Sequence, residues 1–345
     1  MMFRPTVLLL LGVFFVQNVQ PSRLYNDITS LENKILELLE QEKKGGEMCM
    51  PTDKLDLNAD GPQTPSPIDV NDCNGLIVPS NDENCVDIDI STCGTTNCIL
   101  GFETNEKGCV TSCACKTEGL FQGDIMLSQE DVAEIETANK GENRAASKLK
   151  KRWNNIPGSG GTFVVPYTLD PSIQRNPRAV SAISDAMKQY AEETCIRFQK
   201  RTNEADYLEF FVGRGCYSYI GRTGGKQQVS IGRGCEWKGV VMHEMLHAMG
   251  FWHEHSRPDR DTAVIINMDN VNPKMQFNFK KMAEGLVNSM GSPYDIGSVM
   301  QYDGTAFSIN KKPTILSKKT GQPVKAQRNG FSKEDLFQLR KMYNC

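Results

Sequence analysis

All four histidines of this 345-residue chain lie in one short segment, from His243 to His255. Two of them are four residues apart, and residues at that spacing share one face of a helix. His243 and His247 can therefore present two imidazoles to a single metal ion. Gly250 can take the left-handed conformation that ends a helix, which lets the chain reverse and bring His253 to the same ion. The spacing predicts a helix and a turn that together hold a metal.

Three imidazoles suit a zinc site that keeps one position open for water. We expect one Zn²⁺ per catalytic domain, bound by neutral imidazoles that bring the pKa of its water down to roughly 7. Glu244 lies beside the ligands without being one, and it is placed to take the proton of that water. The alternative, a cluster of core histidines, requires the ligand spacing, Glu244 and Gly250 to coincide by chance. His255 falls outside the ligand set, so we expect it near the ligands or at the surface.

The beginning of the chain predicts export. Arg4 is followed by an apolar run from Val7 to Val16, which is the charge-then-apolar layout of a secretory signal and is too short to span a bilayer. We expect a signal peptide over residues 1–20, without a clear cleavage site, and a secreted, extracellular protein. The alternative is a buried N-terminal strand.

The cysteine count and the charge limit the compartment and the partners. Twelve cysteines, an even number, fit an exported protein whose thiols are paired. The formal charge of -3, from 39 basic and 42 acidic residues, offers no excess of positive charge to nucleic acid or to an anionic membrane. We expect neither nucleic acid nor a membrane as a partner.

A cysteine-rich segment occupies residues 49–115. It holds eight of the cysteines among many Asp, Asn, Gly, Pro and Thr residues, and it shows little helical periodicity. This composition is typical of a small module stapled by disulfides. Before it, apolar residues at helical spacing predict a short amphipathic helix over residues 28–44.

From Trp153 onward the pattern becomes that of an ordinary globular domain. The predicted elements are strands at 163–168, 207–212 and 228–231, and helices around 183–191 and over 240–249. Ser332 can cap a final helix. Strands that alternate with helices suggest an α/β layer.

Residues 243–261, which end in the run His-Glu-His-Ser-Arg-Pro-Asp-Arg-Asp, resemble the signature of the astacin metalloproteases within the metzincins. The resemblance runs from about Trp153 to Cys345. It implies a zinc endopeptidase that hydrolyses internal bonds of protein or peptide substrates, and we expect a monomer. Its fold would be mixed α/β, with two lobes: a mostly parallel twisted sheet and the active-site helix in the upper lobe, and an irregular lower lobe with the C-terminal helix.

Further site residues follow from the same resemblance. Residues 294–302 are similar to the family's Met-turn, which implies that Met300 lies beneath the zinc and that Tyr302 is a weak, movable ligand that also supports the oxyanion. Gln301 stands where most members have His, which could change the hydrogen bonds around the ligands. The disulfide pairs would be Cys195 with Cys345 and Cys216 with Cys235.

The run Phe121-Gln122-Gly123-Asp124 resembles the family's propeptide switch, whose aspartate takes the zinc position that water needs. Asp124 would then be a ligand in the zymogen only. The alternative is a plain Gly-Asp turn. Cysteines 93–115 are similar in spacing to antistasin-type inhibitor repeats, which leaves a second function open: a cysteine-rich module that binds or inhibits proteases beside a secondary catalytic domain.

These features divide the chain into three parts. We expect a propeptide over residues 21–144 and an astacin-like catalytic domain over residues 145–345. A trypsin-like protease would cut after Arg144, although Lys150-Lys151-Arg152 offers a competing site. The resemblance implies that the new amino terminus folds inward and meets Glu254, the residue after the third histidine.

Overall fold

The computed structural model describes residues 87–89, 92–93, 98–116, 119–139, 152–153 and 161–345. The expected signal peptide, the helix over residues 28–44 and the cleavage site after Arg144 lie outside these residues. Its strands are β1 (Phe102–Thr104), β2 (Val110–Cys115), β3 (Ile125–Met126), β4 (Phe163–Leu169), β5 (Ile196–Lys200), β6 (Tyr207–Phe211), β7 (Cys216–Tyr219), β8 (Lys226–Ile231), β9 (Val264–Ile266) and β10 (Ile315–Ser317). Its α-helices are α3 (Gln129–Asn139), α4 (Pro171–Gln174), α5 (Pro177–Glu193), α6 (Lys238–Ala248) and α7 (Lys333–Tyr343).

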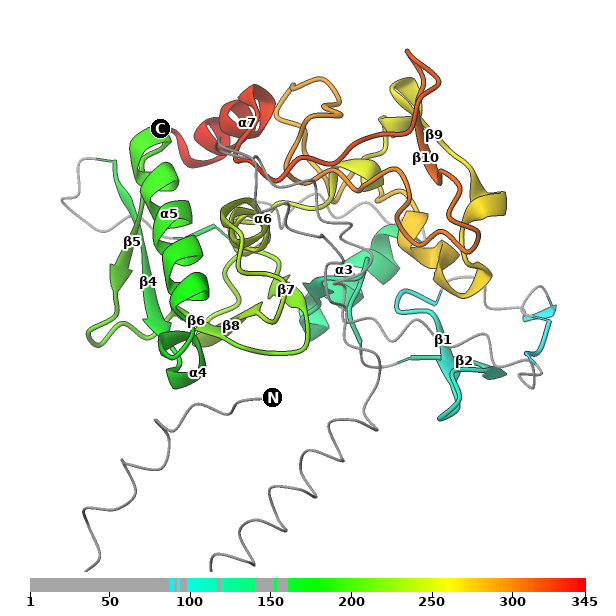
Figure 1. Ribbon diagram of the computed structural model, residues 1–345, viewed down its shortest axis with the longest axis horizontal. Coiled ribbons are helices and arrows are strands. Elements are labelled where there is room, and N and C mark those ends of the chain that lie inside the picture. The colour runs from blue at the N-terminus through cyan, green and yellow to red at the C-terminus, as the bar shows by residue number, and fades with distance from the viewer. Residues whose placement is uncertain (1–86, 90–91, 94–97, 117–118, 140–151, 154–160) are drawn as a thin grey trace, which may run out of the picture. The chain divides into compact units, whose positions relative to one another are not determined.

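A six-stranded sheet forms one half of the globular domain (Figure 1). Its strand order is β3-β7-β8-β6-β4-β5, and all neighbouring pairs are parallel except β7 with β8. The predicted mixed α/β fold with a mostly parallel sheet is confirmed. β3 comes from the segment expected to be the propeptide, and it extends the sheet beyond β7.

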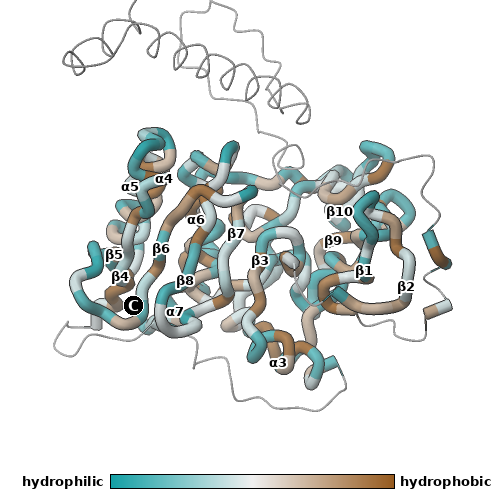
Figure 2. Tube along the Cα trace, turned by 90° about the horizontal axis from the view of Figure 1, so that it is seen from below, coloured by the Kyte–Doolittle hydropathy of each residue, from teal (hydrophilic) through white to brown (hydrophobic). Residues whose placement is uncertain are grey.

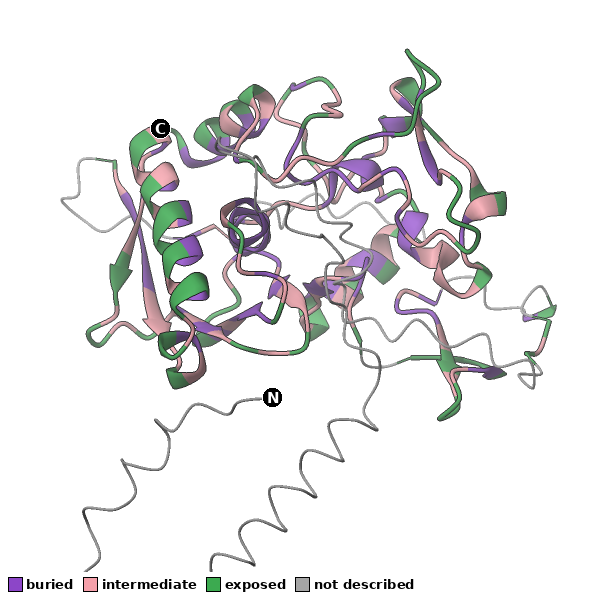
Figure 3. Cartoon of the chain, viewed as in Figure 1, coloured by how far each residue is buried: buried purple, intermediate pink, exposed green. Residues whose placement is uncertain are grey.

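The helices beside the sheet form where local sequence starts them. The Asn176 side chain accepts a hydrogen bond from the Ala179 amide, and Pro177 occupies the first turn of α5. Buried residues recur every three or four positions along α5, from Ala179 to Tyr190, so one side faces the core and the other faces solvent (Figure 3). In contrast, α6 is buried on all sides, as Figure 3 shows where it is seen end-on.

Two separate apolar cores mark the two lobes. The larger core joins the sheet, α5 and α6 to α7, and it includes Val299 and Met300. The second core lies around Phe279 and Tyr302, next to the antiparallel pair β9 and β10. Figure 2 shows β9 and β10 at the opposite end of the domain from β4 and β5, with α6 between them. This second half has little regular structure, as the resemblance implies.

Disulfides tie both the globular domain and the segment before it. Cys195 pairs with Cys345 and Cys216 with Cys235, which are the pairs that the resemblance implies. In the cysteine-rich segment, two bonds join residues 93–113 and 98–115 around the hairpin of β1 and β2. Burial of one strand face alone would not stabilise so small a hairpin, so the crosslinks supply what a core cannot.

The capping prediction for the last helix is also confirmed. The Ser332 hydroxyl accepts from the Asp335 amide, and the Asp335 carboxylate accepts from the Ser332 amide, so the two residues form a capping box at the start of α7. Within the described residues, no helix is long and apolar enough to cross a membrane.

Substitution at Gly239 tests how tightly α6 is packed. A Cβ atom at this position would lie 1.7 Å from the carbonyl oxygen of Arg328, a backbone atom that cannot swing away. We expect Gly239→Ala to lower the free energy of unfolding by about 3 kcal/mol, because overpacking forces the backbone to shift. Gly285→Ala is the matched control, since nothing lies within 4 Å of its Cβ position. Equal thermal unfolding of the two variants would contradict the packing.

Candidate metal centre

Helix α6 carries the first two predicted ligands in the middle of the domain. His243 and His247 lie one turn apart, and the side chains of both are buried. The Nδ1 atom of His243 faces the carbonyl oxygen of Val299 at 2.8 Å, and that of His247 faces the carbonyl oxygen of Phe251 at 2.7 Å. Each ring is therefore held from behind by a backbone acceptor, which places its proton on Nδ1 and leaves the Nε2 lone pair free for a metal.

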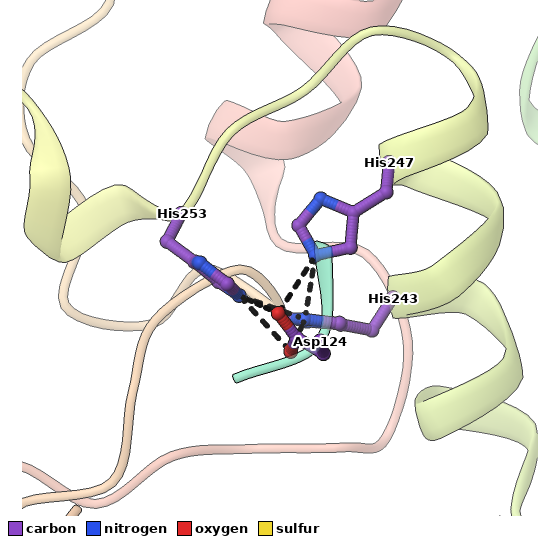
Figure 4. Close-up of side chains that lie close together, drawn as sticks. All are labelled: Asp124, His243, His247 and His253. Atoms are coloured by element: carbon purple, nitrogen blue, oxygen red, sulfur yellow. Dashed lines mark hydrogen bonds and ion pairs between the residues drawn. The ribbon is translucent and has the colours of Figure 1, made fainter. Parts of the chain in front are cut away.

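The turn after α6 delivers the third histidine. Gly250 has a φ of +103°, as its predicted role at the helix end requires, and its amide donates to the His247 carbonyl. The indole of Trp153 donates to the Ala248 carbonyl at 2.9 Å, so one carbonyl left without a partner at the helix end is satisfied. His253 then points back at the two helical histidines (Figure 4).

The three rings converge through their Nε2 atoms. The His243 nitrogen lies 3.2 Å from that of His247 and 3.2 Å from that of His253. Tetrahedral zinc with Zn–N bonds of about 2.0–2.1 Å separates its ligand nitrogens by about 3.3 Å, so the spacing fits the ion. Burial lowers the pKa of His243 to about 3 and that of His253 to about 4, so both rings are neutral at pH 7 and able to bind metal.

Asp124 completes the group. Its carboxylate lies 3.1 Å from the Nε2 atoms of both His243 and His253, and 3.7 Å from that of His247 (Figure 4). Burial raises the pKa of Asp124, but the charge of His253 and hydrogen bonds from the three rings outweigh that effect and hold the pKa well below its usual value. The four side chains together form a group that can hold a metal ion.

Residues 146–344 match the family model described as Astacin, which stands for a family of peptidases. The chain belongs to the astacin family. It is 38% identical to zinc metalloproteinase nas-6 of Caenorhabditis elegans over 68% of this chain and 66% of that protein. It is also 39% identical to the human meprin A subunit beta over 66% of this chain and 30% of that one. The chain spans about half of the length of a further relative, zinc metalloproteinase nas-15 of Caenorhabditis elegans, at 36% identity over 77% of this chain.

A solved structure shares the fold. High choriolytic enzyme 1, a hatching enzyme zinc-protease from Oryzias latipes, superposes with a TM-score of 0.53 and 38% sequence identity. The match covers 57% of this chain and 96% of that one. The part of the chain that matches is thus the globular domain, and the cysteine-rich segment before it is additional.

Glu244 of this astacin domain is buried next to the ligands. Burial raises its pKa well above the usual value, and the charge of Asp124 raises it further. One of its carboxylate oxygens, Oε2, has no hydrogen-bond partner among the described residues. A carboxylate with a raised pKa and a free oxygen is suited to exchanging protons near neutral pH.

Tyr302 lies against the histidines, but its hydroxyl donates to the carbonyl of Gln122 from the preceding segment. Its ring stacks on that of His255 with a centroid separation of 3.8 Å. His255 is fully buried, and its Nε2 atom meets the Asn278 carbonyl at 2.9 Å. Of the two places expected for His255, the structure therefore selects the one near the ligands. Gln301 bridges the Tyr294 hydroxyl and the Tyr302 carbonyl.

The turn that carries Met300 is tied to the last helix. The Asp335 carboxylate, which caps α7, also accepts from the Ser298 hydroxyl at 2.6 Å and from the Val299 amide at 3.0 Å. Met300 is buried in the main core, and its carbonyl accepts from the Glu254 amide. The same turn therefore positions the Val299 carbonyl behind His243 and fixes the start of the segment after His253.

Glu254 is already paired in this structure. Its carboxylate accepts from Arg257 at 3.1 Å and from the Asp295 amide at 2.7 Å. Even so, burial raises its pKa to about 8. A cavity of about 80 Å³ lies beside it, lined by Met300, Met342 and residues of α3 among others.

One residue near the site has no signal in the sequence. Arg328 lies far along the chain, and its guanidinium donates to the Gln327 carbonyl at 2.8 Å. Its charge acts on both Asp124 and Glu244, and it lowers the pKa of the latter. No spacing rule relates position 328 to the histidines, so only the close approach of its backbone to Gly239 brings it here.

The geometry predicts one zinc ion per chain in purified, folded protein. We expect His247→Ala to lose most of this metal, because two imidazoles hold zinc far more weakly than three. His255→Ala should keep it, since that ring faces Asn278 rather than the ligand group. Metal analysis by mass spectrometry measures both, and folded wild-type protein without zinc would contradict the site.

Proposed function

We propose that this protein is a secreted zinc endopeptidase, made as a latent precursor and activated by proteolysis. The observation that carries the proposal is the spacing of the three Nε2 atoms, which suits zinc, next to the buried carboxyl group of Glu244. Disulfides in the globular domain and in the segment before it fit an oxidising compartment.

The catalytic roles follow from the positions of the side chains. Zinc in this site supplies a Lewis acid that activates water for attack on a peptide carbonyl. Glu244 takes the proton and returns it to the leaving amine. In the mature enzyme the Tyr302 hydroxyl no longer has the Gln122 carbonyl as its acceptor, so it can donate to the oxyanion. Once β3 has left, the edge of β7 can pair with the backbone of a substrate.

Glu244→Ala tests the base separately from the metal. We expect the processed variant to keep its zinc and to lose activity by a factor of about 10³ or more, because the proton acceptor is gone while the ligands remain. Tyr302→Phe should lower kcat more than it changes KM, since the hydroxyl acts on the transition state. Cleavage of a peptide library by the activated enzyme provides the assay. Near-normal turnover of the Glu244 variant would assign that residue another role.

Latency is proposed to come from Asp124, which occupies the space between the three rings that water needs. The backbone around it supports this role. The Ser218 amide donates to the Asp124 carbonyl at 2.9 Å, and Phe121 packs edge-on against Trp252. The carboxylate is thus held on both sides, by the strand after it and by the aromatic ring before it.

In the uncut precursor, Asp124→Ala should produce activity that a chelator abolishes. Removing the carboxylate opens the position that it covers, while the rest of the segment stays in place. Glu136→Ala is the matched control, because Glu136 is an exposed carboxylate on α3 and should leave the precursor silent. A silent Asp124 variant would show that steric cover alone enforces latency.

The cysteine-rich segment is proposed to belong to this latent state. Lys274 of the second lobe contacts the Asp87 carboxylate at 3.1 Å and donates to the Gly108 carbonyl at 3.0 Å. Gly101 lies so close to the Phe277 ring that a Cβ atom there would be 2.7 Å from it. A segment that packs on its own catalytic domain favours a propeptide role over the alternative of an independent inhibitor of other proteases.

For activation we propose a cut by a trypsin-like protease after Arg144, which divides a propeptide over residues 21–144 from a catalytic domain over residues 145–345. The competing bond after Arg152 is poorly placed. Trp153 is 2% exposed in the main core, and Arg152 donates to the Met342 carbonyl at 2.7 Å. A new amino terminus that reached Glu254 would give this carboxylate a second cation and favour its charged form.

Sequencing the amino terminus of the active, secreted enzyme decides between the two bonds. We expect it to begin at Ala145. A start at Trp153 would exclude the proposed cut. In the processed enzyme only, Glu254→Gln should lower the unfolding temperature by several degrees more than in the precursor, because only the processed chain has an amino terminus for the carboxylate to meet.

A further inference from the structure

The outer hydrogen bonds of the three histidines come from two different parts of the chain. His243 and His247 each face a backbone carbonyl of the catalytic domain, and both carbonyls remain after processing. In contrast, the Nδ1 atom of His253 faces the side-chain oxygen of Gln122 at 2.9 Å. Gln122 lies in the segment that the proposed processing removes, so His253 borrows its acceptor from the propeptide.

The chemistry of the site settles which atom of the amide faces the ring. A histidine that binds metal through Nε2 carries its proton on Nδ1, so Nδ1 needs an acceptor, and only the oxygen of the Gln122 amide can be one. The contact is buried, with Gln122 1% exposed and His253 fully buried. The Gln122 nitrogen has no partner among the described residues, so this side chain is committed to the single bond with His253.

The backbone holds Gln122 in place for this contact. Phe121 and Ile125 exchange two hydrogen bonds, of 2.8 and 3.0 Å, which close a short loop with residues 122–124 at its tip. Gln122 has a φ of +49°, in the left-handed region that a residue with a long side chain rarely adopts. Such strain costs about 1 kcal/mol or more and persists where the surroundings require it. Here the tip aims the Gln122 side chain, the Gln122 carbonyl and the Asp124 carboxylate at the site together.

We propose that Gln122 is a positioning residue for zinc in the precursor, which orients His253 and tightens metal binding independently of the Asp124 carboxylate. This inference rests on the proposed zinc site. Outer partners of metal-bound histidines fix the ring and its tautomer, and their loss typically costs about 10- to 100-fold in metal affinity. The precursor therefore binds zinc more tightly than the mature enzyme, and part of the difference comes from a residue that is not a ligand.

The test measures zinc transfer from the full-length precursor to a competing chromophoric chelator. Gln122→Ala is expected to weaken zinc binding about tenfold. Gln122→Glu should restore it to near the wild-type value, because a carboxylate is also an acceptor for the Nδ1 proton. Gln129→Ala, which removes an exposed glutamine at the start of α3, is the matched control and should change nothing.

Two further readouts separate positioning from a general loss of folding. Thermal unfolding of the zinc-free precursors should be alike for Gln122→Ala and Gln122→Glu, and the visible absorption of the cobalt-substituted precursor should change for Gln122→Ala only. After processing, all variants have the same sequence and should release zinc at one rate. Equal zinc retention by wild type and Gln122→Ala, or equal weakening by Ala and Glu, overturns the inference while leaving the protease proposal intact. A folded wild-type precursor without zinc overturns both.

Discussion

The rest of the structure depends on the close approach of three buried imidazole nitrogens. Neutral Nε2 atoms at 3.2 Å direct lone pairs at one another, which is favourable only around a cation. Each ring must therefore be held from behind by an acceptor for its Nδ1 proton. The acceptors for His243 and His247 are backbone carbonyls, and much of the surrounding fold serves to place them. The Asp335 carboxylate fixes the turn behind one ring, and the left-handed Gly250 fixes the turn behind the other.

The same demand explains why α6 is buried on all sides while other helices keep a solvent face. A helix that carries two ligands must exclude water from the metal and resist small rotations, so the sheet, α5 and the last helix all pack against it. Gly239 shows how close this packing is, because the backbone at Arg328 lies where a side chain would begin. That approach also brings a guanidinium charge to the site, where it acts on Glu244.

In the precursor, one short loop answers several needs of the site at once. Its tip supplies a carboxylate among the three rings, an acceptor for the third ring, and an acceptor for the Tyr302 hydroxyl. Strand β3 then joins the sheet edge, and the cysteine-rich hairpin contacts the second lobe through Lys274. Latency so distributed does not depend on a single bond, and removal of the segment leaves several polar groups of the catalytic domain without partners at one time.

The sequence by itself determined what local spacing controls. His243 and His247 follow from the periodicity of a helix, His253 from the conformational freedom of Gly250, and the start of α7 from the capping chemistry of Ser332, because each involves residues only a few positions apart. The pairing of distant cysteines and the role of Met300 came from resemblance, since no local rule connects them. Only the tertiary structure decided that His255 stacks on Tyr302, that Arg257 already neutralises Glu254, and that Gln122 and Arg328 reach the site. These contacts join segments far apart in the chain, and long-range packing, unlike helical periodicity, leaves no spacing in the sequence that could reveal it.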